Sequence, residues 1–277
     1  MKLRHLLKYL LFILTVFSCS KGFTQSKDLG YYENKMLAIH TEIDSRLNLK
    51  RNIRYDSLIY FNDSVEYFVE KLEMELTRLI TDNPKTLDFA FKKLVDSDIC
   101  RITTSVDGNF RMYDLDSWLL KKTIYQWRGA DNVYTKVVCY EEDSSRYCRN
   151  IITVAVKGKP YYLPVTFIIN YPEQSMESVS VWRIHGNSLD AAPLFKNSLE
   201  KLDHIDVPFS VYNLIMEKDS LMRFITYDDK QQKVYVPFVN GMGVFTKSYF
   251  IYELKGDYLE FTNIGEMKEE KGIVKPR

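Results

Sequence analysis

The stretch Tyr147–Asn170, YCRNIITVAVKGKPYYLPVTFIIN, decides the fold of this chain. Two runs rich in β-branched residues flank Gly158-Lys159, and such side chains suit the packed surface of a pleated sheet. Outside the N-terminus, no other part of the chain is as apolar. The stretch therefore predicts a β-hairpin with its turn at Gly158-Lys159, and we expect the hydrophobic core to form around it.

From Ile99 onward, the hydrophobic pattern has the period of two that is typical of β-strands. Asp107-Gly108 lies between ICRITTS and FRMYDLD, which predicts a hairpin with a type I′ turn. Further strands are predicted at residues 122–127, 133–141, 177–185, 209–216, 223–227, 233–239, 244–254 and 258–261. Residues 190–206 are expected to be irregular. Pro164 and Pro237 fall inside predicted strands, so each is expected at a sheet edge or a bulge.

The part of the chain before Ile99 has a helical pattern instead. Apolar residues three to four apart predict helices over residues 33–52 and 57–81, and Asn83-Pro84 ends the second helix. A short helix is predicted from Thr86 to Val95. The fold class is therefore α+β, with N-terminal helices packed on a large antiparallel β-meander. A sandwich, a bent sheet and a partly propeller-like arrangement all remain open.

Residues 1–25 have the pattern of an export signal. Lys2, Arg4 and Lys8 precede the apolar run LLFILTVF, which is too short to span a bilayer comfortably. Two processing routes compete: lipidation at Cys19, preceded by a small serine as in a bacterial lipobox, and ordinary cleavage near Thr24-Gln25. An uncleaved anchor helix is the third reading. The expected organisation is a signal at 1–25, a helical region at 26–98, a β domain at 99–262 and a charged tail at 263–277.

Export implies an oxidising compartment, in which disulfides form. If residues 133–156 fold as a hairpin that turns at Asp143-Ser144, Cys139 lies directly opposite Cys148. Opposed cysteines on antiparallel strands can reach disulfide distance, so this register predicts a Cys139–Cys148 bond. Two buried free thiols are the alternative. Cys100 is expected to be a small core residue.

The charge balance bears on the class of partner. The chain has 277 residues, with 38 Lys and Arg against 37 Asp and Glu, so its net charge is +1. Nucleic-acid binding needs a basic face that neutralises phosphates, and this composition does not indicate one. We expect an envelope protein or a glycan as partner, and membrane contact only through a lipid anchor at Cys19.

Two segments resemble a set of uncharacterised exported β-rich proteins of Gram-negative bacteria. The first is SVDGNFRMY from Ser105, followed by an acidic residue, Trp118 and the IYQW run from Ile124; the second is FIYELKGDYL from Phe250. The resemblance covers about residues 99–262 and implies location and class only, since no activity is assigned to the set. Members carry a Gly-Thr-rich turn after the acidic residue, whereas this chain has Leu119-Leu120-Lys121.

The candidate site residues lie on the segment after the first β-turn. Asp114 and Asp116 share one face of an extended segment near Asp107 and Asn109, and carboxylates of this kind hold Ca²⁺. A complete calcium-binding loop is missing, so a solvated turn rim is the competing reading. The candidate binding residues are Arg111, Asp114, Asp116 and Trp118.

Other residue patterns that carry chemistry are less specific. His204 and Asp206 sit in an extended loop, where we expect them to point apart, and no Gly-x-Ser-x-Gly motif accompanies them. His40, His185 and His204 are too far apart in sequence to indicate a zinc site. Trp118, Trp127 and Trp182 are either core residues or a sugar-stacking platform. We assign no catalytic residue, metal ligand or cofactor from the sequence.

These observations predict an exported, envelope-associated protein of the periplasm or the outer membrane, with a non-catalytic binding or assembly role. A hydrolase acting on glycan or peptide is the alternative. The deepest cleft should separate the two: convergent carboxylates or a histidine with a perturbed pKa favour an enzyme, whereas an aromatic patch favours binding.

Overall fold

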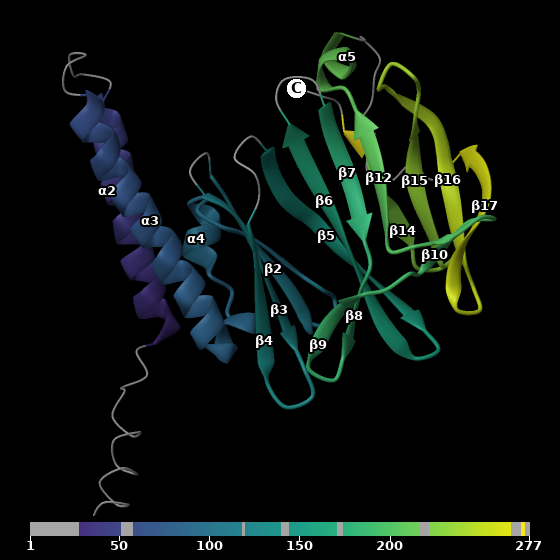
Figure 1. Cartoon of the computed structure of the whole chain (residues 1–277), viewed down its shortest axis with the longest axis horizontal. Coiled ribbons are helices and arrows are strands. Elements are labelled where there is room, and N and C mark those ends of the chain that lie inside the picture. Colours follow the sequence, from purple (N-terminus) through teal and green to yellow (C-terminus); the bar gives the residue numbers. More distant parts are fainter. Residues whose placement is uncertain are drawn as a thin grey trace, which may run out of the picture.

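The computed structural model describes residues 28–50, 58–117, 120–139, 144–170, 174–216, 222–266 and 273–274. The protein is α+β, with its helices at the N-terminal side and mainly antiparallel sheets behind them. Figure 1 shows the layers in chain order: the helices, a first sheet of β2–β4, a second sheet around β5–β7, and a third sheet around β14–β17.

The helical layer consists of α2 (Leu29–Lys50), α3 (Leu58–Asp82), the 3₁₀ turn η2 (Pro84–Leu87) and α4 (Lys92–Asp96). The two long predicted helices are confirmed, and the second ends at Asp82, just before Asn83-Pro84 as predicted; Asn83 caps the following turn η2. The short predicted helix is divided, because Phe91 adopts a left-handed backbone (φ 47°) just before α4. Glu33 of α2 is buried and accepts a hydrogen bond from the Lys93 backbone N–H (2.7 Å), which ties α4 to α2.

The first sheet, called sheet A here, has the order β1-β2-β3-β4 and packs between the helices and the second sheet. Its strands are β1 (Arg101–Thr104), β2 (Phe110–Ser117), β3 (Leu120–Arg128) and β4 (Val133–Cys139). Tyr113 and Ile124 join the core formed with the helices, whereas Phe110 and Trp127 join a second core on the opposite face. Sheet A is therefore buried on both faces over much of its area.

The hairpin between β1 and β2 is confirmed, but its turn is not type I′. Among the described residues of this turn, only Gly108 has positive φ (71°), and the Gly108 N–H bonds to the Ser105 carbonyl (2.9 Å). Asp107 accepts hydrogen bonds from the Ser105 hydroxyl (2.6 Å) and the Asn109 N–H (3.1 Å), so its side chain organises a longer loop.

The second sheet, sheet B, is built on the hairpin of the deciding stretch. It has the order β12-β7-β6-β8-β9, and β5 pairs with the remaining edge of β6. The strands are β5 (Ser144–Val156), β6 (Lys159–Asn170), β7 (Gln174–Ser180), β8 (Trp182–His185), β9 (Ser188–Ala191) and β12 (His204–Phe209). The turn is Lys157-Gly158, one residue earlier than predicted, and both φ values are positive (50° and 73°), as type I′ requires.

The third sheet, sheet C, closes the main core. It has the order β11-β10-β17-β16-β15-β14, and its inner face packs on sheet B through residues such as Val165, Val207 and Val236. The strands are β10 (Phe195–Lys196), β11 (Lys201–Leu202), β14 (Thr226–Asp228), β15 (Lys233–Val239), β16 (Phe245–Lys255) and β17 (Tyr258–Glu266). A small pair, β13 (Met222–Arg223) with β18 (Ile273–Val274), completes the described strands.

Residues 190–216 depart from the predicted meander. Residues 190–206, expected to be irregular, contribute β10 and β11, and β10 pairs with β17 in parallel. Residues 209–216, predicted as a strand, form the helix α5 (Val211–Met216) after β12 ends at Phe209. A two-residue strand such as β10 has too short a pattern to be read from periodicity.

The predicted prolines lie where strand pairing is interrupted. At Pro164, β6 changes its partner from β7, which pairs from Val165 onward, to β8, which pairs at Tyr162. At Pro237, the ladder between β15 and β16 shifts its register. Proline has no N–H to donate to a neighbouring strand, and at both positions this missing donor falls where the pairing is interrupted.

The predicted Cys139–Cys148 disulfide is wrong. Cys139 ends β4 and pairs with Lys122 in sheet A, whereas Cys148 lies on β5 and pairs with Thr166 in sheet B. Both thiols are free, and Cys139 is exposed while Cys148 is buried. The error arose because residues 144–156 form one continuous strand that takes β6 as its partner over its whole length, instead of turning back on β4.

Candidate functional site

The polar residues of β12 and β7 converge on a cleft between sheets A and B, called the A–B cleft here. His204 lies opposite Ser180 and Asp206 lies opposite Ser178 in the antiparallel register. All four side chains line the cleft. The prediction that His204 and Asp206 point apart is wrong, because residues two apart on a strand share a face.

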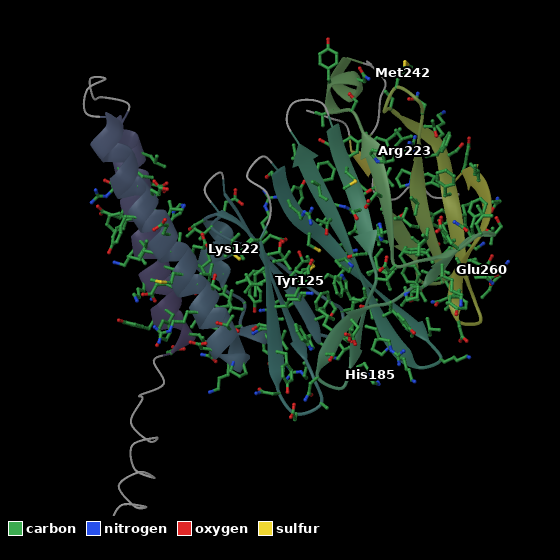
Figure 2. All side chains as sticks on the ribbon, viewed as in Figure 1. Lys122, Tyr125, His185, Arg223, Met242 and Glu260 are labelled. Atoms are coloured by element: carbon green, nitrogen blue, oxygen red, sulfur yellow. The ribbon has the colours of Figure 1, made fainter. Side chains whose placement is uncertain are left out.

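The cleft has a volume of about 300 Å³. Sheet A contributes Met112 and Tyr125, while β5 and β8 of sheet B contribute Arg146 and Trp182. Tyr125, labelled in Figure 2, lies between the strands of the two sheets. A volume near the lower end of the ligand-pocket range, with a few polar groups beside aromatic rings, suits a small ligand or part of a larger one.

One side of the cleft is aromatic. The rings of Tyr125 and Trp182 lie 5.6 Å apart between centroids, at an interplanar angle of 58°. Lys136 Nζ lies 5.5 Å from the centre of the Trp182 ring, and Trp182 Nε1 donates to Ser180 Oγ (3.0 Å). Burial raises the pKa of Tyr125 to about 12, so its hydroxyl stays neutral and can donate a hydrogen bond at physiological pH.

The other side of the cleft is charged. Asp203 Oδ1 lies 2.7 Å from His204 Nδ1, and this hydrogen bond raises the pKa of the imidazole, with Asp206 adding to the effect. The His204 side chain is 59% exposed, so water screens these interactions strongly. An exposed imidazole of this kind can bind an anionic or hydroxylated ligand, or exchange a proton with it.

The candidate residue Arg111 lies in the interior, between sheet A and the helices. Its Nη1 donates to the carbonyl oxygens of Thr86 (2.9 Å) and Phe89 (2.6 Å). Its Nε donates to Thr104 Oγ1 (2.8 Å), and the residue is 8% exposed. These bonds hold the connector between α3 and α4 on the sheet, which is a structural role.

The candidate residue Asp114 is also interior, 1% exposed, and not part of a solvated rim. It accepts hydrogen bonds from Thr123 Oγ1 (2.5 Å) and from the Cys148 backbone N–H (2.7 Å). These contacts join sheet A to β5 of sheet B. The structure therefore separates Asp114 from Asp107, which stabilises the first turn and accepts a bond from the Tyr162 hydroxyl (2.7 Å).

The remaining sequence candidates lie elsewhere. Trp127 is 7% exposed and belongs to the core between sheets A and B. Trp118 and Cys19 lie outside the described residues, and so does the side chain of Asp116. Across the described part of the chain, no group of three or more His, Cys, Asp or Glu side chains could hold a metal ion.

Sequence reasoning missed most of the cleft, although one signal was present. In ESVSVW, the residues alternate so that Glu177 and Val179 face the core while Ser178, Ser180 and Trp182 line the cleft. The polar face of this strand could have been proposed as a site. Tyr125 and Arg146 could not, because their approach depends on how sheets A and B stack.

Comparison with known proteins adds no relative. The chain matches no family model, no curated protein and no solved structure. None of the described helices is long and apolar enough to cross a membrane.

Proposed function

We propose that the protein is an exported, non-catalytic binding protein of the cell envelope whose A–B cleft binds a glycan. The observation that carries this proposal is the meeting of an aromatic pair, Tyr125 and Trp182, with hydroxyl and charged side chains in one cleft. Sugars present apolar C–H faces that stack on aromatic rings, and hydroxyl groups that need hydrogen-bond partners. Both requirements are met within this one cleft.

The charges of the cleft favour a glycan that carries carboxylate groups. Lys136 lies over the Trp182 ring and Arg146 lines the cleft, so two cations stand close to the stacking surface. A carboxylate-bearing sugar stacked on Trp182 can accept charge-assisted hydrogen bonds from them. Asp206 at the opposite side can accept bonds from sugar hydroxyls.

The location is proposed from the N-terminal sequence. The basic start and the apolar run Leu10–Phe17 support export, and Cys19 offers an anchor if it is lipidated. A position in the periplasm or at the outer membrane would bring the cleft into contact with envelope glycans. An envelope protein that carries such a glycan is a partner of the same chemistry.

Isothermal titration calorimetry tests the proposal with two probes, a tetrasaccharide of uronic acid units and a neutral glucose tetrasaccharide. We expect one site per chain, tighter for the acidic probe, and a loss of about tenfold or more in Trp182→Leu. Tyr67→Leu, on the exposed face of α3, is the matched control and should bind normally. If neither probe binds, or if Trp182→Leu binds both unchanged, the cleft is not a glycan site.

One observation favours a hydrolase as the second candidate. Asp203 orients His204, and the register places Ser180 directly across from that histidine. In this arrangement Asp203, His204 and Ser180 would take the roles of acid, base and nucleophile in a serine hydrolase. However, Ser180 Oγ already accepts a hydrogen bond from Trp182 Nε1. The side chains of Asp203 and His204 are also widely open to water. Mass spectrometry of a peptide probe and of an O-acetylated form of the acidic tetrasaccharide after long incubation distinguishes the two functions, because a serine hydrolase cleaves amide or ester bonds and leaves glycosidic bonds intact.

A further inference from the structure

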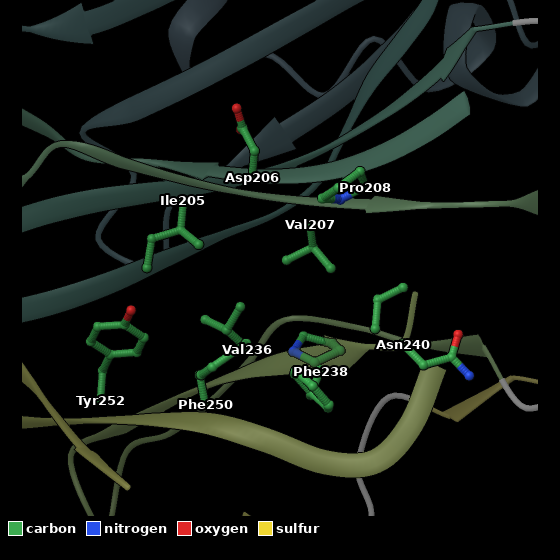
Figure 3. Close-up of a pocket in the computed structure, with 11 residues that line it drawn as sticks. Ile205, Asp206, Val207, Pro208, Val236, Phe238, Asn240, Phe250 and Tyr252 are labelled. Carbon is green, nitrogen blue, oxygen red and sulfur yellow. The ribbon is translucent and has the colours of Figure 1, made fainter. Parts of the chain in front are cut away.

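A second cavity lies on the other side of β12, between sheets B and C, and is called the B–C groove here. Its volume is about 330 Å³, which falls in the range of small-ligand sites. Figure 3 shows Ile205 and Val207 of β12 pointing toward Val236 of β15 and Phe250 of β16, while Asp206 points away from the groove. The strand β12 therefore separates the B–C groove from the A–B cleft.

The groove stays open because β12 and β15 cannot join into one continuous ladder. β12 is the edge strand of sheet B, and its only strand partner among the described residues is β7. Pro208 on β12 and Pro237 on β15 both line the groove, and proline has no N–H to donate across it. The register shift at Pro237 also bends β15. The opening is thus built into the two strands.

The walls of the groove are mainly apolar, and the polar side-chain groups directed at it are the Tyr252 hydroxyl and the Asn240 amide. Tyr252 is only 8% exposed, and its ring is held by Phe195 and Phe261 at centroid distances of 5.1 and 5.8 Å. Buried tyrosines normally bond their hydroxyl to a partner. In the part of the chain that the structure describes, no hydrogen bond joins the Tyr252 hydroxyl to a protein group and the hydroxyl is open to water, and Figure 3 shows it directed into the groove. Its burial raises the pKa of the phenol, so the group remains a donor.

The polar groups of the groove indicate the charge of its ligand. None of the described residues that line it is basic, and its one carboxylate, Asp206, points away. Asn240 lies at the end of the groove opposite Tyr252. Its Oδ1 accepts bonds from the Met242 and Val244 N–H groups (3.0 and 3.1 Å), which leaves Nδ2 as a second donor. An anionic head group would be buried here without a positive charge to pair with. A neutral oxygen acceptor needs only a hydrogen-bond donor, which the groove supplies.

We propose that the B–C groove binds a neutral, single-chain amphiphile. Its apolar chain lies between Ile205, Val207 and Val236, and its hydroxyl or ester oxygen accepts a hydrogen bond from Tyr252. Burial of the chain removes apolar surface of both ligand and groove from water, and the hydrogen bond orients the head group. This site is separate from the A–B cleft, so it stands whether or not the cleft binds a glycan.

The test uses two probes of the same chain length, 1-monolauroylglycerol and dodecanoate, with the full chain at pH 8. Both are kept below the concentration at which they form micelles, and binding is measured by calorimetry. We expect one molecule of monolauroylglycerol per chain and binding of dodecanoate at least about tenfold weaker, because the carboxylate is desolvated without a cation. Equal or tighter binding of dodecanoate would overturn the assignment of a neutral head group.

Variants identify the groove as the site. Ile205→Trp should fill the groove and abolish binding, whereas Tyr252→Phe removes only the hydroxyl and should weaken monolauroylglycerol about two- to tenfold. Tyr67→Phe, on the exposed face of α3, is the matched control for the loss of a phenol. Circular dichroism and cooperative unfolding confirm that each variant folds. If Ile205→Trp does not fold, Val239→Trp fills the same groove from β15.

The outcomes divide clearly. Binding that is lost on filling the groove and weakened in Tyr252→Phe supports the proposal. Absence of binding for monolauroylglycerol, or binding that is unchanged in the groove-filling variant, overturns it. The groove-filling variant should still bind the uronic acid tetrasaccharide, because the A–B cleft is intact in it. This result separates a blocked groove from a general loss of binding.

Discussion

At the scale of single residues, Glu177 is an acidic side chain buried beside an arginine. It is 1% exposed on β7, and it accepts hydrogen bonds from Arg149 Nη2 (3.1 Å) and from the Ile225 backbone N–H (2.8 Å). Arg149 also donates to the Ile225 carbonyl (2.7 Å) and lies over the Phe224 ring. The pair thus connects sheet B to the segment that enters sheet C.

Burial raises the pKa of Glu177 to about 7, and its bonds with Arg149 and Ile225 only partly oppose this shift. In the unfolded chain, a glutamate titrates near its ordinary value, about 4.3. The folded state therefore holds this proton more tightly. The stability that Glu177 contributes is complete below the unfolded pKa and is lost as the pH rises through about 7.

We predict that Glu177→Gln removes this part of the pH dependence. Between pH 4.5 and pH 8, the free energy of unfolding of the native protein should fall relative to that of the variant, by up to about 3 kcal/mol. Urea unfolding at four pH values measures the difference. Glu260→Gln is the control, because its carboxylate pairs with Lys196 at the surface and its pKa is lowered. A constant difference between native protein and Glu177→Gln across this range would contradict the expectation.

At the scale of elements, the turn Lys157-Gly158 shows how local chemistry fixes the central hairpin. Both residues have positive φ, and nothing lies within 4 Å of a Cβ added at Gly158. Gly158→Ala should therefore cost about 1–2 kcal/mol through backbone strain alone. Gly241→Ala is the matched control, since its added Cβ also meets nothing within 4 Å and its φ is ordinary.

The companion variant Lys157→Asn should change stability by less than about 0.5 kcal/mol, because asparagine tolerates the left-handed conformation. It also loses an exposed ion pair with Asp257, which contributes little. Thermal unfolding of the three variants checks the set. Equal effects of Gly158→Ala and Gly241→Ala would show that the positive φ at Gly158 carries no cost.

The elements that the sequence predicted are those with a long pattern of their own. The stripe of Val65, Leu72 and Leu76 defined α3, and the β-branched runs around Gly158 defined β5 and β6. The helix α5 was predicted as a strand because its six residues are too few to separate the two periods. The turn position was one residue off, since Lys157 gives no sequence signal for positive φ.

At the scale of the whole molecule, the order of the layers could not be read from the chain. Each strand shows which of its faces is apolar, but not which neighbour covers that face. Met112 and Thr166 are distant in sequence and meet in the A–B cleft only because sheet A stacks on sheet B. The B–C groove likewise depends on Pro208 and Pro237, which belong to different sheets. Both proposed sites lie between layers, so the pattern of one strand can show a polar face, as in β7, but not the neighbouring sheet that completes the site.

The cysteines provide a test of this layered topology. Cys139 is exposed at the end of sheet A, whereas Cys148 and Cys100 are 4% and 2% exposed. Burial raises the pKa of both interior thiols, and the nearby Asp114 adds to the shift, so their reactive thiolate forms are strongly disfavoured. We predict that iodoacetamide at pH 8 modifies Cys139 readily and the two buried thiols at least about a thousandfold more slowly, since these react only when the core opens.

Peptide mapping by mass spectrometry after timed labelling measures the three rates separately. In 8 M urea, all three thiols should react at similar rates, which shows that burial and not local sequence protects them. Digestion without reduction, of protein recovered from an oxidising compartment, adds the decisive comparison. A peptide that joins Cys139 to Cys148 would require the Cα atoms of these residues to lie within about 7 Å, as they do when β4 and β5 pair in one sheet. The separation of sheets A and B, and with it the A–B cleft, would then be wrong.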